Sequence, residues 1–121
     1  MKSFNLINHT SLIENYPCHI ATVTKNNLPN LAVAADIKVL DKDTLLISHN
    51  EMVNTPKNIE SNKNVVLTTF NENWEGLKIK GTATYHTSGE YMQLCNQFFK
   101  NEDITPKGCI VVKVSSIDNF S

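Results

Sequence analysis

Apolar and polar residues alternate along much of the chain, which is the pattern of β-strands with one buried face. The clearest run predicts a strand over residues 31–39, with apolar residues at Leu31, Val33, Ala35, Ile37 and Val39. Asp36 and Lys38 fall on its other, outward face. Shorter runs predict strands over residues 18–24, 44–49, 65–70, 77–85 and 109–114. The pattern therefore predicts six strands, a high β content for 121 residues.

Short polar turns join the first three of these strands. Lys25, Asn26 and Asn27 form a turn rich in residues that tolerate the left-handed conformation, and Asp41, Lys42 and Asp43 form a similar link. These turns predict antiparallel hairpins.

Three segments are expected to be helical instead. Thr55 is a hydroxyl N-cap and Pro56 suits the first helical position, so a helix is predicted from there to about Asn62. A second helix follows Ser88, and its apolar stripe at helical spacing comprises Tyr91, Met92, Leu94, Cys95, Phe98 and Phe99. A weaker helix is predicted within residues 4–15.

An antiparallel sheet of this size must protect its edge strands, and closure into a small barrel does so most economically. The absence of repeats and low-complexity linkers predicts one domain over residues 1–121. Because the chain is small, we also expect a second copy to cover an exposed apolar flank.

Composition and charge exclude several classes of function. The net charge of −1 argues against a broad cationic surface for nucleic acid or anionic lipid. No run approaches the ~20 apolar residues of a membrane span, and the polar start of the chain does not resemble a signal peptide, so we expect a cytoplasmic protein. Cys18, Cys95 and Cys109 are widely spaced, which predicts three reduced thiols and no metal site. The four glycines are too dispersed for a dinucleotide or ATP loop.

Six segments, taken together in their order and spacing, resemble the FMN-binding split β-barrel family. They are residues 27–33, 38–47, 50–58, 64–67, 76–83 and 108–114. The most similar branch comprises short pyridoxamine 5′-phosphate oxidase-like proteins and small FMN-binding proteins. The resemblance implies a six-stranded antiparallel split barrel with two or three short helices, and a homodimer with FMN sites at its interface.

The resemblance places the FMN phosphate at the predicted helix that begins near Thr55. Unpaired amides at a helix N-terminus attract anions, and the candidate residues there are Asn54, Thr55, Lys57 and Asn58. Many relatives have Gly-Lys-Thr where this chain has Val53, Asn54 and Thr55. Since that lysine is missing, Lys57, Lys80 or Lys38 is a candidate to compensate. A good helix start without a ligand remains the alternative interpretation.

The flavin ring is expected between the second and third strands and the loop that follows. The matching positions are Ala34, Ala35, Asp36, Ser48, His49 and Asn50. The two alanines either let the backbone approach a planar ligand closely or simply pack tightly. His49 is a candidate to donate a proton near the flavin, but it is more simply a polar strand end. Trp74, the single tryptophan, lies in a polar loop and is a candidate either to cover the flavin of the dimer partner or to be buried at the dimer interface.

Two functions follow from this resemblance. The first is an FMN-dependent oxidoreductase of unknown substrate, in which no residue is identified as a catalytic acid or base. The second is a non-catalytic flavin- or haem-binding module, such as an electron carrier or a storage or sensing dimer. The sequence leaves FMN, a deazaflavin and haem open as the ligand. Binding of single-stranded nucleic acid is disfavoured because it requires a basic groove with stacking aromatics.

Overall fold

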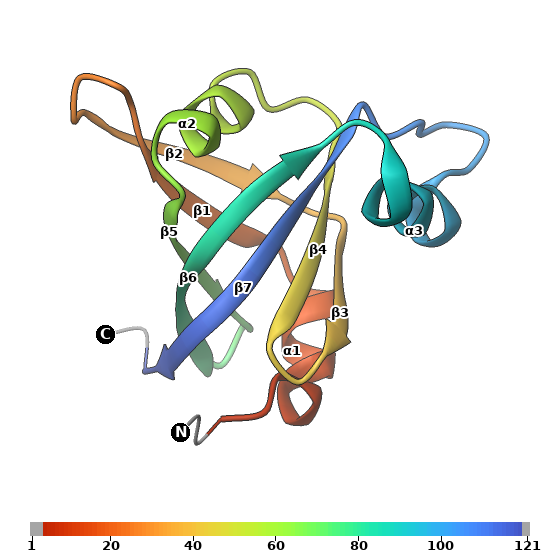
Figure 1. The fold of residues 1–121 in the computed structure, drawn as a ribbon. Helices are drawn as coiled ribbons and strands as arrows, with labels where there is room; N and C mark the ends of the chain where they lie inside the picture. The colour runs from red at the N-terminus through yellow and green to blue at the C-terminus, as the bar shows by residue number, and fades with distance from the viewer. Residues whose placement is uncertain (1–3, 120–121) are drawn as a thin grey trace.

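One antiparallel sheet organises the structure, a computed structural model that describes residues 4–119 (Figure 1). The strands of the described part are β1 (Cys18–Val23), β2 (Pro29–Ala34), β3 (Ile37–Asp41), β4 (Thr44–His49), β5 (Asn64–Phe70), β6 (Gly76–His86) and β7 (Gly108–Asp118). Their order in the sheet is β2-β1-β5-β6-β7-β4-β3. The helices are η1 (Leu6–His9, a 3₁₀ turn), α1 (Thr10–Asn15), α2 (Thr55–Ser61) and α3 (Gly89–Phe99).

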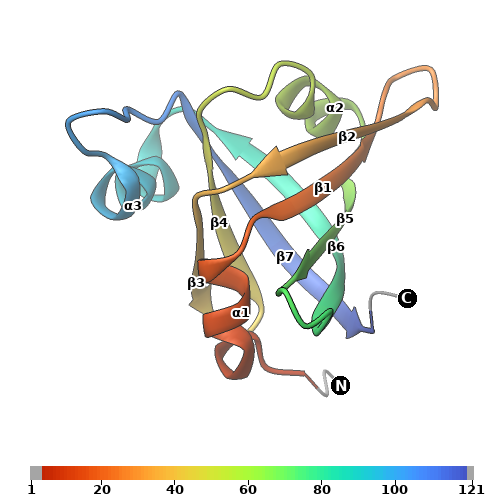
Figure 2. The same cartoon turned by 180° about the vertical axis from the view of Figure 1, so that it is seen from behind.

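The sheet curls on itself because its two edge strands, β2 and β3, are consecutive in the sequence (Figures 1 and 2). The short link between these two strands is tied to β4, since the amide of Ser48 donates to the carbonyl of Asp36 at 3.0 Å. The curled sheet encloses the main apolar core, which includes Ile20, Leu45, Ile47, Leu67, Ile79 and Ile110, all fully buried. Leu6 and Ile13 close this core at the α1 end, and Ile59 of α2 closes it at the other.

The structure has seven strands and not six, because the strand predicted over residues 31–39 is interrupted at Ala35 and Asp36. The side chains of Ala34 and Ile37 are both buried, although they are three residues apart. Such a spacing is impossible in an unbroken strand, where the side-chain period is two. The interruption therefore reverses the predicted face of β2, and Leu31 and Val33 lie outward, 67% and 56% exposed.

The predicted helices are present, but the start of α2 differs in detail. Its N-cap is Asn54, so Thr55 is the first helical residue and Pro56 the second. The side chain of Thr55 makes no capping bond. Ser88 is the N-cap of α3, as expected, although its side chain makes no capping bond either.

Helix α3 lies against the outside of β4 and β7 and forms a second, smaller core with them. Its buried members are Leu46, Met92, Cys95, Cys109 and Val111. The prediction of three thiols is wrong for two of the cysteines, since Cys95 and Cys109 form a disulfide with 6.0 Å between their Cα atoms. The sequence conceals this pairing because only the return of α3 onto β7 brings the two together. Cys18 is free and buried, as predicted.

None of the helices in residues 4–119 has the length and apolar character needed to cross a membrane.

Candidate functional site

The structure gathers most of the predicted site residues in two adjoining regions. We call the first the corner, which comprises residues 34–36 and 48–58, from the end of β2 and the end of β4 to the start of α2. The second, the outer face, comprises the outward side chains of β1, β2, β5 and β6. No helix crosses the outer side of β1 and β2 in Figure 2.

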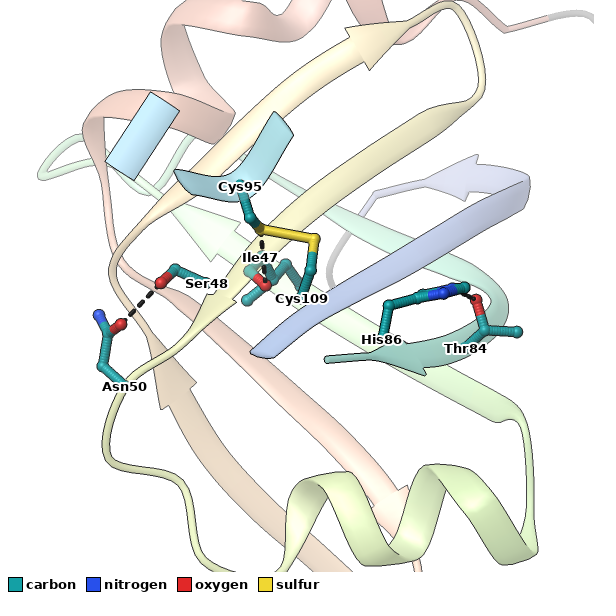
Figure 3. Close-up of a disulfide and its surroundings, with 7 residues drawn as sticks. All are labelled: Ile47, Ser48, Asn50, Thr84, His86, Cys95 and Cys109. Atoms are coloured by element: carbon teal, nitrogen blue, oxygen red, sulfur yellow. Dashed lines mark hydrogen bonds between the residues drawn. A yellow bond between two sulfur atoms is a disulfide. The ribbon is translucent and has the colours of Figure 1, made fainter. Parts of the chain in front are cut away.

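Three predicted residues of the corner form one hydrogen-bonded chain. The hydroxyl of Ser48 donates to Asn50 Oδ1 at 2.6 Å (Figure 3). Asn50 Nδ2 donates in turn to Asp36 Oδ2 at 2.8 Å. Ser48 is buried, whereas Asp36 and Asn50 are half-buried. These bonds hold the loop after β4 against the link between β2 and β3, so the polar atoms serve first to fix the backbone.

The side chain of His49 points away from the hydrogen bonds that join Ser48, Asn50 and Asp36, because neighbouring residues of a strand face opposite sides. Its Nε2 lies 2.7 Å from the carbonyl oxygen of Met52, and its Nδ1 lies 2.6 Å from the hydroxyl of Tyr85. A carbonyl only accepts, so Nε2 carries a proton, and in the neutral ring the Tyr85 hydroxyl donates to Nδ1. Both nitrogens are thus engaged within the protein, in agreement with the interpretation of His49 as a structural strand end.

Tyr85 packs closely over Gly108, the residue opposite His49 in the β4–β7 ladder. A Cβ atom at Gly108 would overlap the Tyr85 hydroxyl and ring. Burial raises the pKa of Tyr85 above its ordinary value, and the negative charge of Glu60 adds to this. The phenol therefore remains protonated and available as a donor to His49.

The start of α2 contains a buried hydroxyl without a partner. Thr55 is fully buried, and its Oγ1 makes no hydrogen bond within the described structure. Lys57 is exposed on the same turn. Asn58 is less available than the sequence suggested, because its amide donates to the carbonyl of Asn54 at 3.0 Å and its Nδ2 donates to Thr22 Oγ1 at 3.0 Å.

The outer face contains a mostly apolar cavity of about 470 Å³. Lys80 is the predicted site residue that lines it. The full lining is Ala21, Thr22, Val23, Pro29, Asn64, Val65, Val66, Lys80, Gly81, Thr82 and Ser115. Because Thr22 both lines the cavity and binds Asn58, the cavity adjoins α2.

Trp74 lies apart from both regions, in the turn between β5 and β6. This turn is beside α1, at the opposite end of the barrel from α2 (Figures 1 and 2). The indole is 70% exposed and stacks on Phe70, with ring centroids 5.2 Å apart, and Phe70 stacks in turn on His19. Trp74 has φ +62°, a strained conformation for a bulky residue. Within the chain, Trp74 and Thr55 therefore do not share a site.

Comparison with known proteins gives these regions a context. Residues 9–120 match the sequence model of the family described as pyridoxamine 5′-phosphate oxidase. The chain belongs to the pyridoxamine 5′-phosphate oxidase family. It is 41% identical over 112 residues to an uncharacterised protein of Methanocaldococcus jannaschii, a match that covers 89% of this chain and 75% of that protein.

Solved structures share the fold of this pyridoxamine 5′-phosphate oxidase family member. HupZ of Group A Streptococcus superimposes with a TM-score of 0.87 and 24% identity, covering 94% of this chain and 92% of that one. An FMN-binding protein from Syntrophomonas wolfei superimposes with a TM-score of 0.78 and 21% identity, covering 96% and 86%. The seven-stranded sheet is therefore a split barrel of the predicted kind.

The two alanines predicted to flank a flavin are separated by the end of β2. Ala34 is buried among the main core residues, which agrees with the packing interpretation, whereas the side chain of Ala35 is exposed. Asn54 is exposed at the N-cap of α2.

Sequence reasoning missed the residues that support the corner from behind. Tyr85, Met52 and Thr22 each bind a predicted residue but belong to apolar or unremarkable stretches. The sequence contains one feature that could have indicated them. A glycine at the start of a buried strand, here Gly108, marks a place where another group approaches the backbone closely.

Proposed function

We propose that this protein binds FMN at the junction of the corner and the outer face, in a homodimer, and acts as a flavin oxidoreductase whose substrate is unknown. Family membership and the split-barrel fold support this proposal, as does the similarity to an FMN-binding protein. The observation that carries it is the unpartnered Thr55 hydroxyl. A buried polar group without a partner costs about 1–3 kcal/mol, and a phosphate oxygen that reached it on a small movement of α2 would remove that cost.

The residues present fit the chemistry of FMN. Thr55 offers a hydroxyl donor and Lys57 a positive charge for the phosphate, while the neighbouring apolar cavity suits the flat ring. Bound FMN would supply hydride and electron transfer. The chain itself binds the phosphate, excludes water through the apolar lining, and places Lys80 at the cavity as a positive charge. The Ser48–Asn50–Asp36 chain fixes the loop that leads to α2.

The second protomer is proposed to cover the outer face. Leu28, Leu31 and Val33 are 56–67% exposed on or beside β2. An antiparallel sheet with such residues outward normally packs against another surface. Lys78 and Lys80 of β6 lie on the same face as these residues of β2, because directly opposed residues share a face across the ladders from β2 through β1 and β5 to β6. We expect a two-fold dimer, in which Trp74 of each protomer is a candidate to contact the flavin of the other.

One observation favours the non-catalytic alternative. The side chains that could move a proton near the corner are already committed, with His49 bonded at both nitrogens and Asp36 bonded to Asn50. A protein that only holds a flavin or haem needs no free acid or base, so an electron carrier or sensing dimer remains the second candidate.

FMN titration of the purified protein tests the main proposal. We expect a yellow complex, and a dissociation constant raised about tenfold or more in Thr55→Val, equivalent to the loss of about 1.4 kcal/mol. Lys63→Ala is the matched control, because Lys63 is exposed just beyond α2 and should change the affinity less than twofold. Failure of the native protein to bind FMN would contradict the proposal. Equal effects of the two substitutions would place the phosphate elsewhere.

Anaerobic mixing of the FMN complex with NADH or NADPH then separates the two candidates. Bleaching of the flavin on the timescale of turnover supports a reductase, whereas an unchanged spectrum favours a carrier or sensor. Light scattering measures the assembly, and Leu31→Glu should convert the dimer to a monomer, since the charge replaces an exposed apolar side chain without entering the core.

A further inference from the structure

The disulfide between Cys95 and Cys109 lies beside the corner, at the end of the sheet. Cys109 is directly opposite Ser48 in the β4–β7 ladder and directly opposite His86 in the β6–β7 ladder. Directly opposed residues project to the same side of a sheet, so Ser48, Cys109 and His86 form a row beneath α3 (Figure 3). Both cysteines are fully buried.

The core around this disulfide is separate from the interior of the barrel. The main core and the cluster of Leu46, Met92, Cys95, Cys109 and Val111 do not share members. Local opening of α3 therefore exposes the smaller cluster without disrupting the barrel, which is the behaviour of a region that unfolds and refolds by itself.

The same backbone also accommodates the reduced pair. Cys95 Sγ lies 3.9 Å from the carbonyl oxygen of Ile47, within reach of a weak hydrogen bond from a thiol (Figure 3). In the reduced state Cys95 therefore has an acceptor, and Cys109 remains a small apolar side chain among Leu46 and Val111. The imidazole of His86, half-exposed and bonded through Nε2 to Thr84 Oγ1 at 2.7 Å, links this row to the surface.

We propose that Cys95 and Cys109 form a thiol–disulfide exchange site whose redox state sets how firmly α3 is held on the sheet. The reductant is a dithiol. Its thiolate attacks one protein sulfur, the Cys95–Cys109 bond breaks, and a mixed disulfide forms. The second thiol of the reductant then displaces the protein sulfur. The dithiol loses two electrons and becomes a disulfide, and its two protons end on Cys95 and Cys109.

Because both sulfurs are buried, exchange follows the local opening of α3. The oxidised state joins the helix covalently to β7, and the reduced state leaves it held by non-covalent contacts, most of them apolar. The proposal concerns the α3 side of the sheet and does not depend on whether FMN binds.

Alkylation with iodoacetamide, read by mass spectrometry, tests the redox pair. When the protein with its unaltered sequence is unfolded without reductant, we expect one alkyl group, on Cys18. After incubation of the folded protein with dithiothreitol, acid quenching and unfolding, we expect three. Three groups before reduction would show that the disulfide is absent. A disulfide that dithiothreitol cleaves only after unfolding in urea would show a static link, and either result overturns the proposal.

Hydrogen–deuterium exchange tests the consequence for α3. We expect amides of residues 89–99 to exchange about tenfold faster or more in the reduced protein, and those of residues 55–61 in α2 to change less than twofold, because opening free energies differ between regions. The variant with both Cys95→Ser and Cys109→Ser should match the reduced protein with or without dithiothreitol. Equal protection of α3 in both redox states would overturn the proposal, even if the disulfide is reducible.

Discussion

Helices α2 and α3 flank the same sheet, but different interactions attach them to it. Helix α3 has 11 residues, an apolar stripe and a covalent bond to β7. Helix α2 has seven residues and buries Thr55 and Asn58 together with Pro56 and Ile59. The apolar helix is fixed by packing and a disulfide, whereas the polar helix retains a buried hydroxyl with no partner. The difference is one of satisfied bonding, since the described structure leaves a buried polar atom unpartnered in α2.

The largest expected effect is on the α3 side. Cys95→Ala removes the disulfide, which closes a loop over a separation of 14 residues. In the chain-entropy model, loss of such a loop lowers the free energy of unfolding by about 3 kcal/mol. Urea denaturation without reductant measures this difference. With dithiothreitol present, the native protein and the variant should differ much less, and a persistent gap would assign the effect to lost packing instead.

A clash at the back of the corner should have the next largest effect. Gly108→Ala places a Cβ against the Tyr85 hydroxyl, and overpacking of this kind costs about 1–3 kcal/mol. Tyr85→Ala removes both the hydroxyl and the ring that this Cβ would overlap, and provides the partner for a double-mutant cycle. We expect the double variant to be less destabilised than the sum of the two single variants. Additive losses would show that the clash is relieved elsewhere.

The buried thiol of Cys18 predicts that the free energy of unfolding falls as the pH becomes alkaline. Burial raises the pKa of Cys18 from 9.0 to about 12. The unfolded chain therefore loses the thiol proton first, and stability present below pH 9 is lost as the pH rises towards 12. The slope is at most about 1.4 kcal/mol per pH unit. Urea denaturation between pH 8 and about 10.5 should show a flatter profile for Cys18→Ala, and an unchanged slope would contradict this origin.

The smallest effect is a gain in stability on the α2 side. Thr55→Val keeps the shape of the side chain and removes the unpartnered hydroxyl, so the ligand-free protein should be stabilised by about 1 kcal/mol. Thermal unfolding without FMN measures it. The substitution that weakens FMN binding is thus expected to strengthen the empty fold. A loss of stability would mean that the hydroxyl already has a partner in solution.

The sequence predicted the fold well because its strands and turns are local signals. Asn27 adopts φ +65° in the turn where a residue tolerant of that conformation was expected. The reversal of β2 was not predictable, since it depends on a two-residue interruption that leaves the alternation of apolar residues intact. Periodicity tells which side chains share a face but not whether that face meets the core or a second surface.

The candidate site was predicted less completely, for similar reasons. Asp36, Ser48 and Asn50 come together as expected, because they lie at neighbouring strand ends. The bonds of His49 to Tyr85 and of Asn58 to Thr22 each join residues 36 positions apart, so no local pattern reveals them. The assignment of all these residues to a cofactor remains a prediction.

The exposed turn at Trp74 gives the molecule a built-in optical reporter. It is the single tryptophan of the chain, and 70% of its surface is in contact with water. Its intrinsic fluorescence should therefore resemble that of a hydrated indole in an isolated protomer, and shift to shorter wavelength when another surface covers it. Emission recorded during serial dilution would follow the joining of two chains without any added label.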